Sequence, residues 1–142
     1  MSVREQFSWV WLAVMVVVYG AYFASVLLLR AHGEIPFLME FVLLGAAGLT
    51  QMIILGAASL VMRARREARA RTKPDERDRA IEHHATTMAY YVLVAGMIVV
   101  GCVTPFTASG WEIVRAAVLA IVIAEIVHHG LVVRAYRSGW QA

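Results

Sequence analysis

Four long runs of hydrophobic residues, separated by short polar stretches, dominate the pattern along the chain. The runs cover residues 7–29, 37–62, 85–103 and 113–133, and each is continuous rather than alternating between apolar and polar positions. A helix needs about 20 apolar residues, at a rise of about 1.5 Å each, to cross about 30 Å of hydrocarbon. A membrane β-barrel would need many alternating strands of about ten residues. The pattern therefore predicts an all-α membrane protein with four transmembrane helices in an up-down bundle.

The composition favours one membrane domain over residues 1–142 and argues against a soluble enzyme. Hydrophobic residues make up 61% of the chain and charged residues 16%, whereas a soluble domain carries about 45–50% and about 25%. The first run, with 23 residues, is longer than the apolar core of a cleaved signal peptide, so we expect it to remain as a membrane helix. We expect no enzymatic activity, because the sequence has no nucleophile elbow, phosphate loop or paired catalytic carboxylates.

Basic residues are distributed unevenly between the ends of the predicted helices. Eight of the thirteen Lys and Arg residues lie in the segment 63–84, between the second and third runs. With both termini on the side of this segment, that side holds eleven basic residues and the opposite side only Arg30 and Arg115. Lys and Arg concentrate in cytoplasmic loops, so the pattern predicts that both termini are cytoplasmic. Topology alone then accounts for the net charge of +3.

The composition of the segment 63–84 predicts a helical hairpin that protrudes from the membrane. Residues 62–71 are rich in strong helix formers, so the second helix should continue about two turns past the membrane. Pro74 suits a first helical turn, and the acidic residues after it complement the dipole of a helix N-terminus. We therefore expect another helix to begin near Pro74 and to run straight into the run 85–103, with an arginine-rich arm facing its acidic start.

Three interpretations of this hairpin are open: membrane topology with local salt bridges, binding of anionic lipid, and docking of a cytosolic protein. Each Lys or Arg near an anionic surface contributes roughly 1 kcal/mol to lipid attraction. Direct binding of nucleic acid is not expected, since no aromatic residues alternate with the basic ones. The residues that would form the partner-binding face are Arg65, Arg66, Arg69, Asp75, Glu76, Arg77 and Asp78.

Few polar side chains fall inside the apolar runs, and each needs a physical reason, because a charge at bilayer depth costs about 2.5–3.5 kcal/mol. Glu125 lies well inside the fourth run, and His128 and His129 follow it at helical-neighbour spacing. A carboxylate beside an imidazole can share a proton, so this cluster fits either structural hydrogen bonding or a proton pathway. Gln51 lies near mid-membrane and is expected to donate a hydrogen bond between helices.

The histidines also raise the alternative of a haem b or metal site. His83 and His84 open the third run on the side where His128 and His129 lie in the fourth, so two imidazoles from different helices could meet. The first pair fits equally well as polar residues at the membrane interface. No CxxCH or HExxH motif supports a metal, so we expect no bound cofactor. The lone Cys102 is expected to be a packing residue.

Two further patterns concern contacts between helices. Glu40 and Arg115 should lie at similar depth and could pair, although Arg115 could also pair with Glu112 or extend outward to water. Small residues, which allow helices to approach closely in lipid, form two faces. The face in the fourth run consists of Ala116, Ala120 and Ala124, with His128 at its polar end. The face in the second run consists of Gly45, Gly48 and Gly56 with Ala46, Ala47 and Ala57. They fit contacts within one bundle or within a homodimer.

Two segments resemble a group of small four-helix bacterial inner-membrane proteins without an assigned activity. One segment is PDERDRAIE at 74–82 followed by AYYVL at 89–93, and the other is AEIVHHG at 124–130 followed by YRSG at 136–139. Proteins of that group have a DERD-type motif before the third helix, which the first segment resembles, and they are often encoded beside helix-turn-helix regulators. His128 and His129 stand where the group more often has a basic residue and an aromatic one. The resemblance implies a bacterial inner-membrane location and a regulatory partner in the cytoplasm.

Our leading functional hypothesis is a non-enzymatic regulatory or scaffold protein that binds a cytosolic partner through the segment 63–84. One alternative is a small transporter or proton pathway that uses Glu125 and His128. The other is a haem-binding membrane protein that uses the two histidine pairs.

Overall fold

The chain folds into four long α-helices, which match the four predicted runs and extend beyond them. The computed structural model describes residues 3–68, 76–108 and 110–138, with the backbone alone at 3–4, 65–68 and 77. The helices are α1 (Val3–Ala31), α2 (Phe37–Ala68), α3 (Glu76–Cys102) and α4 (Gly110–Arg137), and a short 3-10 helix, η1 (Thr104–Phe106), follows α3. The part of the chain that is described contains no strand. The prediction of an all-helical chain is confirmed.

Each of the four helices is long and apolar enough to cross a membrane by length and composition. The predicted continuation of α2 past residue 62 is confirmed, and so is a helix that begins near Pro74 and runs unbroken into the third run. The chain turns between α1 and α2 at Gly33, whose φ of 147° is a conformation that other residues rarely adopt. Pro105 lies in η1, just after the end of α3.

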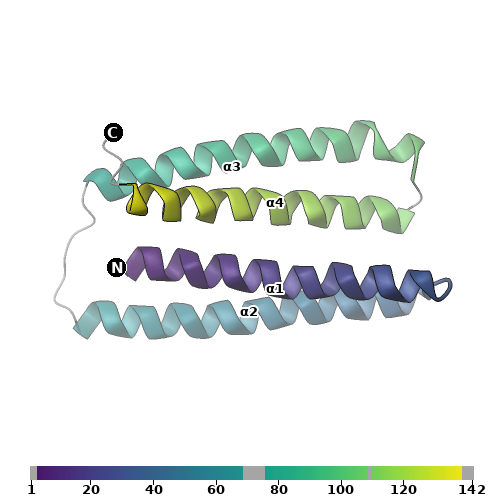
Figure 1. Cartoon of the computed structure of the whole chain (residues 1–142), viewed down its shortest axis with the longest axis horizontal. Coiled ribbons are helices and arrows are strands. Elements are labelled where there is room, and N and C mark those ends of the chain that lie inside the picture. Colours follow the sequence, from purple (N-terminus) through teal and green to yellow (C-terminus); the bar gives the residue numbers. More distant parts are fainter. Residues whose placement is uncertain (1–2, 69–75, 109, 139–142) are drawn as a thin grey trace.

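The helices lie side by side in the order α2, α1, α4, α3, so α1 and α4 occupy the middle (Figure 1). α1 and α3 begin, and α2 and α4 end, at one end of the molecule. We call this the basic end, because Arg63, Arg79, Arg134 and Arg137 lie there. The other end, which we call the loop end, holds the turn at Gly33 and η1.

This order corrects one prediction about the segment 63–84. α2 packs against α1 and α3 packs against α4, so the two helices that flank the segment lie at opposite edges of the row (Figure 1). Among the described residues, they do not form an antiparallel hairpin in which one arm faces the other. Residues 69–75, and with them the predicted partner-binding residues Arg69 and Asp75, lie outside the described part. The same holds for the side chains of Arg65, Arg66 and Arg77.

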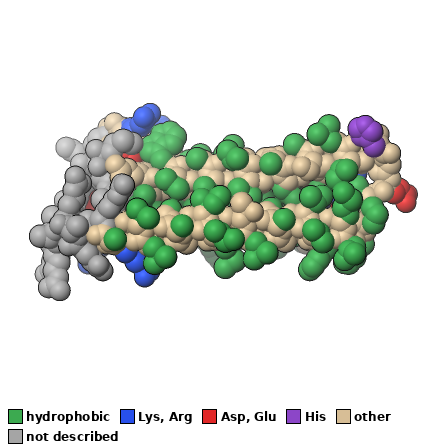
Figure 2. Space-filling model, turned by 90° about the horizontal axis from the view of Figure 1, so that it is seen from below, with side chains coloured by type: hydrophobic (Ala, Val, Ile, Leu, Met, Phe, Trp, Pro, Cys, Tyr) green, Lys and Arg blue, Asp and Glu red, His purple; other side chains and the backbone are tan. Residues whose placement is uncertain are grey.

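The apolar core between the helices is thin, and much of the apolar surface faces outward. One core cluster joins α1 and α2 through Tyr22, Val26 and Ala47, and another joins α3 and α4 around Ile81 and Val132. Figure 2 shows hydrophobic side chains spread along the length of one face, with Lys and Arg side chains near one end. A surface of this kind suits lipid, in which exposed apolar side chains carry no penalty.

α3 and α4 approach each other closely at Gly96. A Cβ atom built on Gly96 would sit 2.9 Å from the Cβ of Ala120. The predicted small-residue face of α4 is therefore used inside the bundle at Ala120. On α2, by contrast, a Cβ built on Gly45 or Gly56 would meet nothing within 4 Å, so these glycines are not sites of close helix contact within the chain.

Replacing Gly96 by Leu should destabilise the protein by about 1–3 kcal/mol, because the added atoms would overlap Ala120 and force α3 away from α4. Unfolding of the purified protein in mild detergent, followed by circular dichroism, measures the change. Gly101→Leu is the matched control on the same helix, since a Cβ there meets nothing within 4 Å. Equal stability of the two variants would contradict the close packing at Gly96.

Candidate functional site

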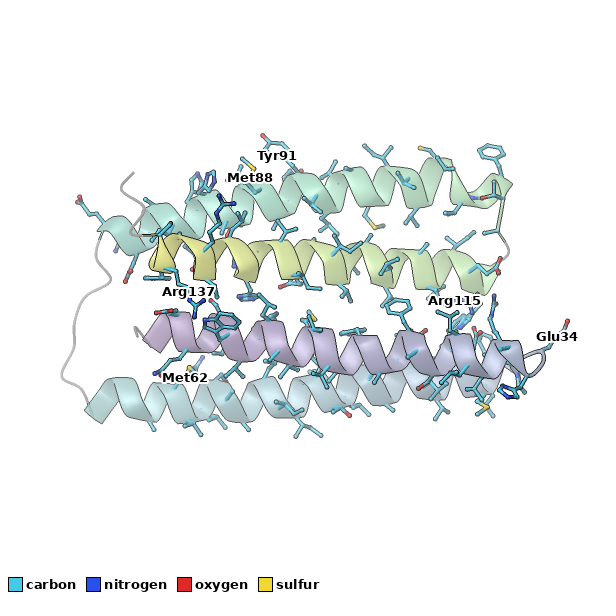
Figure 3. The ribbon with its side chains drawn as sticks, viewed as in Figure 1. Glu34, Met62, Met88, Tyr91, Arg115 and Arg137 are labelled. Atoms are coloured by element: carbon cyan, nitrogen blue, oxygen red, sulfur yellow. The ribbon has the colours of Figure 1, made fainter. Side chains whose placement is uncertain are left out.

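Four charged side chains from three helices meet at the loop end. Arg115 of α4 donates a hydrogen bond from Nη1 to Oε1 of Glu40 on α2 at 2.6 Å, and its Nη2 lies 3.5 Å from Oε1 of Glu112. Arg30 of α1 lies 3.0 Å from Glu112 through Nη1 and 3.7 Å from Glu40 through Nε. Figure 3 shows Arg115 reaching from α4 toward α1, while Glu34 points away from the bundle. We call these four residues the ion cluster.

The ion cluster is buried at its centre and balanced in charge. The side chain of Glu40 is only 5% exposed and that of Arg115 is 11% exposed. Two carboxylates offset two guanidinium groups, which is the condition under which buried charges are tolerated. The Glu40–Arg115 pair was one of the three sequence-based alternatives, and the structure combines it with the Glu112–Arg115 pair. Sequence reasoning missed Arg30, although its position at the end of the first run was the available signal.

A second polar cluster lies toward the basic end, where α4 packs against α3 and α1. Nε2 of His128 lies 3.5 Å from Oε1 of Glu82 on α3, and Nε2 of His129 lies 3.6 Å from Oε2 of Glu125. The two imidazole rings stand edge to face with centroids 4.7 Å apart. His129 is buried, and its ring centroid lies 4.9 Å from that of Trp11 on α1. The contacts Glu82–His128–His129–Glu125 form an unbroken chain of titratable groups.

The two histidines serve different helix interfaces, which spacing alone did not reveal. Both were predicted to neighbour Glu125, but only His129 faces it, while His128 turns toward α3. Successive helical residues differ in direction by about 100°, so adjacent histidines must diverge. Sequence reasoning missed Glu82, since the register of α3 against α4 was needed to place it beside His128.

Gln51 makes its polar contact away from these histidines, with α1. Its Nε2 donates a hydrogen bond to Sδ of Met15 at 3.5 Å, so the prediction of an interhelical donor is confirmed. The chain of titratable groups ends at Glu125, which lies ten residues after Arg115 of the ion cluster in the sequence. That separation corresponds to about 15 Å along α4. A proton pathway through Glu125 and His128 stays a prediction.

The four histidines proposed for haem or metal have different surroundings. His128 and His129 contact carboxylates and Trp11, whereas His83 is exposed on α3 and His84 lines a groove beside Arg134. Within the described ranges, no three His, Cys, Asp or Glu side chains gather in a way that could hold a metal ion.

At the basic end itself, two contacts fasten α4 to its neighbours. The hydroxyl of Tyr136 donates a hydrogen bond to Oδ1 of Asp78 on α3 at 2.6 Å. The guanidinium of Arg137 lies 5.2 Å from the ring centroid of Trp9 on α1, and Figure 3 shows it between the two helices. Asp78 was predicted to belong to the partner-binding face, but its carboxylate bonds to α4.

These features define an all-helical protein with four helices suited to crossing a membrane and with polar clusters that join the helices. Comparison of the chain with protein-family models, with curated proteins and with solved structures gives no match. The resemblance to a group of small bacterial membrane proteins accordingly stays a prediction.

Proposed function

We propose that the chain is a multi-pass protein of the bacterial inner membrane that binds a cytosolic regulatory protein at its basic end. The distribution of Lys and Arg supports a cytoplasmic position for that end, since eleven of the thirteen belong to it by sequence. The DERD-type resemblance supports a regulatory partner.

The observation that carries this proposal is the way α3 begins. α3 starts at Glu76, nine residues before the predicted run at 85–103, and so extends beyond the apolar span. This extension is not a loose arm. Ile81 is buried in a cluster with Val132 of α4, and Asp78 accepts the hydrogen bond from Tyr136. A recognition helix that is already ordered loses less conformational entropy on binding than one that must fold first.

The outward face of the extension carries the candidate docking surface. Glu76, Arg79 and His83 are all exposed. Their spacing of three and four residues places them on one side of the helix. We call them the docking stripe. Of the residues predicted for the partner-binding face, the docking stripe includes Glu76. It does not include Asp78, because the carboxylate of Asp78 accepts a hydrogen bond from α4. A partner with charges of both signs would complement this surface, and the mixed signs would contribute more to specificity than to affinity.

Changing Glu76, Arg79 and His83 together to Ala should abolish recovery of a cytosolic partner by the tagged protein. All three side chains are exposed, so the fold should be unaffected, which circular dichroism in detergent checks. Quantitative mass spectrometry of proteins recovered after cross-linking in cells measures the loss, and at least a tenfold drop is expected. An unchanged set of recovered proteins would overturn the proposal.

Two controls separate docking from folding and from topology. Tyr136→Phe removes the bond to Asp78 without touching the docking stripe, so it should retain the partner if the extension stays folded. Arg79→Cys in a Cys102→Ser background should react with a membrane-impermeant maleimide in broken cells and stay unlabelled in intact cells. Labelling in intact cells would place the basic end outside the cytoplasm and refute the proposed topology.

A further inference from the structure

A groove opens between α3 and α4 at the basic end, on a part of the surface that the docking stripe does not use. Its volume is about 300 Å³. The lining residues are Ile81, His84, Leu131, Arg134, Ala135 and Ser138. A volume of this size is at the lower end of the range for ligand sites and would hold a headgroup rather than a whole lipid.

The polar side of the groove suits a phosphate. Arg134 supplies a guanidinium that makes no ion pair or side-chain hydrogen bond with the described residues. Ser138, four residues further on, also lines the groove, and His84 lines it from α3. An Arg guanidinium binds phosphate through paired N–H donors and keeps its charge at all physiological pH values.

The apolar side of the groove lies deeper along α4. Leu131 is three residues before Arg134, toward the centre of the helix, and Leu131 and Ala135 pack against the cluster of Ile81, Ala85 and Val132. Arg134 directly follows the predicted membrane run at 113–133. A cation at the headgroup level above an apolar wall matches an amphiphile better than a free anion.

The hollow at the loop end provides a contrast. It measures about 510 Å³ and is lined in part by Arg30, Glu34 and Glu40. Its arginine is already paired with Glu40 and Glu112, and its two carboxylates would repel a phosphate. Among the residues that the structure describes, no carboxylate lines the groove of Arg134.

We propose that this groove binds the phosphate of an anionic phospholipid, with Arg134 as the principal contact. The acyl chains would run along Leu131 on the membrane side of the groove. Basic pockets between transmembrane helices at the cytoplasmic side commonly bind anionic headgroups. This inference depends on the membrane placement and not on the cytosolic partner, so either can fail without the other.

The test is native mass spectrometry of the full chain in detergent with phosphatidylglycerol or phosphatidylcholine of matched acyl chains. Wild-type protein should retain phosphatidylglycerol preferentially. Arg134→Gln should lower its affinity about fivefold, the equivalent of one arginine near an anionic headgroup. Arg79→Gln, the same charge change at the same end but outside the groove, should leave retention near wild type. Equal losses in both variants would indicate diffuse charge attraction and would overturn the proposal.

Two further experiments test whether the groove is the binding site and whether the ligand is a lipid. Ala135→Phe fills the groove without changing charge, so it should also reduce retention of phosphatidylglycerol, and wild-type retention would overturn the groove as the site. Excess inorganic phosphate should leave the lipid bound if the acyl chains contribute. Displacement of the lipid by inorganic phosphate would instead identify a site for a free anion.

Discussion

Replacing Glu40 by Ala should lower the free energy of unfolding by about 3 kcal/mol, measured by denaturation in mild detergent. Glu40 is the most buried member of the ion cluster and lies 2.6 Å from Arg115, itself only 11% exposed. Removing one partner of a buried pair leaves the other charge uncompensated, at a cost of about 3–5 kcal/mol. We expect the lower end of that range, since Glu112 remains 3.5 Å from Arg115.

The control is Glu34→Ala, which removes an exposed carboxylate at the same end that points away from the bundle (Figure 3). It should change stability by less than about 0.5 kcal/mol. The double variant Glu40→Met, Arg115→Met removes both charges and should recover most of the loss, because a well-packed apolar pair often replaces a buried ion pair without penalty. If Glu40→Ala proved as stable as Glu34→Ala, the ion cluster would have no role in stability.

This cluster also explains how two helical hairpins become one bundle. Arg30 and Glu40 belong to α1 and α2, whereas Glu112 and Arg115 belong to α4. The ion pairs therefore fasten the first hairpin to the second at the loop end. Trp9 with Arg137, and Trp11 with His129, join α1 to α4 toward the basic end. Polar contacts of this kind give orientation to helices whose apolar faces gain little from contacting one another in lipid.

The sequence was sufficient for the helices and for part of the polar pairing. Continuous apolar runs located all four helices, and the similar depth of Glu40 and Arg115 suggested their contact. The order of the helices was not predictable from the sequence. A helix that is apolar all around has no distinct face that indicates which other helix it packs against. The sequence indicates how deep in the membrane each residue lies. Whether two residues at the same depth touch also depends on which helices are neighbours and on how each helix is rotated about its axis.

The same limit explains the errors at the basic end. Asp78 was assigned to a docking face because it stands in a charged motif, yet its bond to Tyr136 depends on the register between α3 and α4. Glu82 was overlooked for the same reason, although it lies 3.5 Å from His128. Gly96 gave no sequence signal that distinguished it from Gly101, and only the packing shows that it contacts Ala120.

Ile81→Ala should destabilise the protein by about 2–5 kcal/mol, the range for deleting a buried isoleucine to alanine. Ile81 is 2% exposed and packs with Ala85 and Val132 where α3 leaves the predicted membrane run. Since this contact lies beyond that run, water would reach the cavity, and the loss should be concentrated in the extension of α3. Hydrogen–deuterium exchange should therefore accelerate over residues 76–85 before the rest of the helix responds.

Ile98→Ala is the matched control, because Ile98 lies on the same helix but is 57% exposed. It should change stability little, since detergent or lipid replaces the lost contacts. Ile81→Ala leaves the docking stripe chemically intact, so a loss of partner recovery in this variant would show that the partner needs an ordered helix and not only the right charges. If hydrogen–deuterium exchange were uniform along α3 in both variants, Ile81 would not hold the extension on α4. The proposed docking would then lack the ordered helix on which it depends.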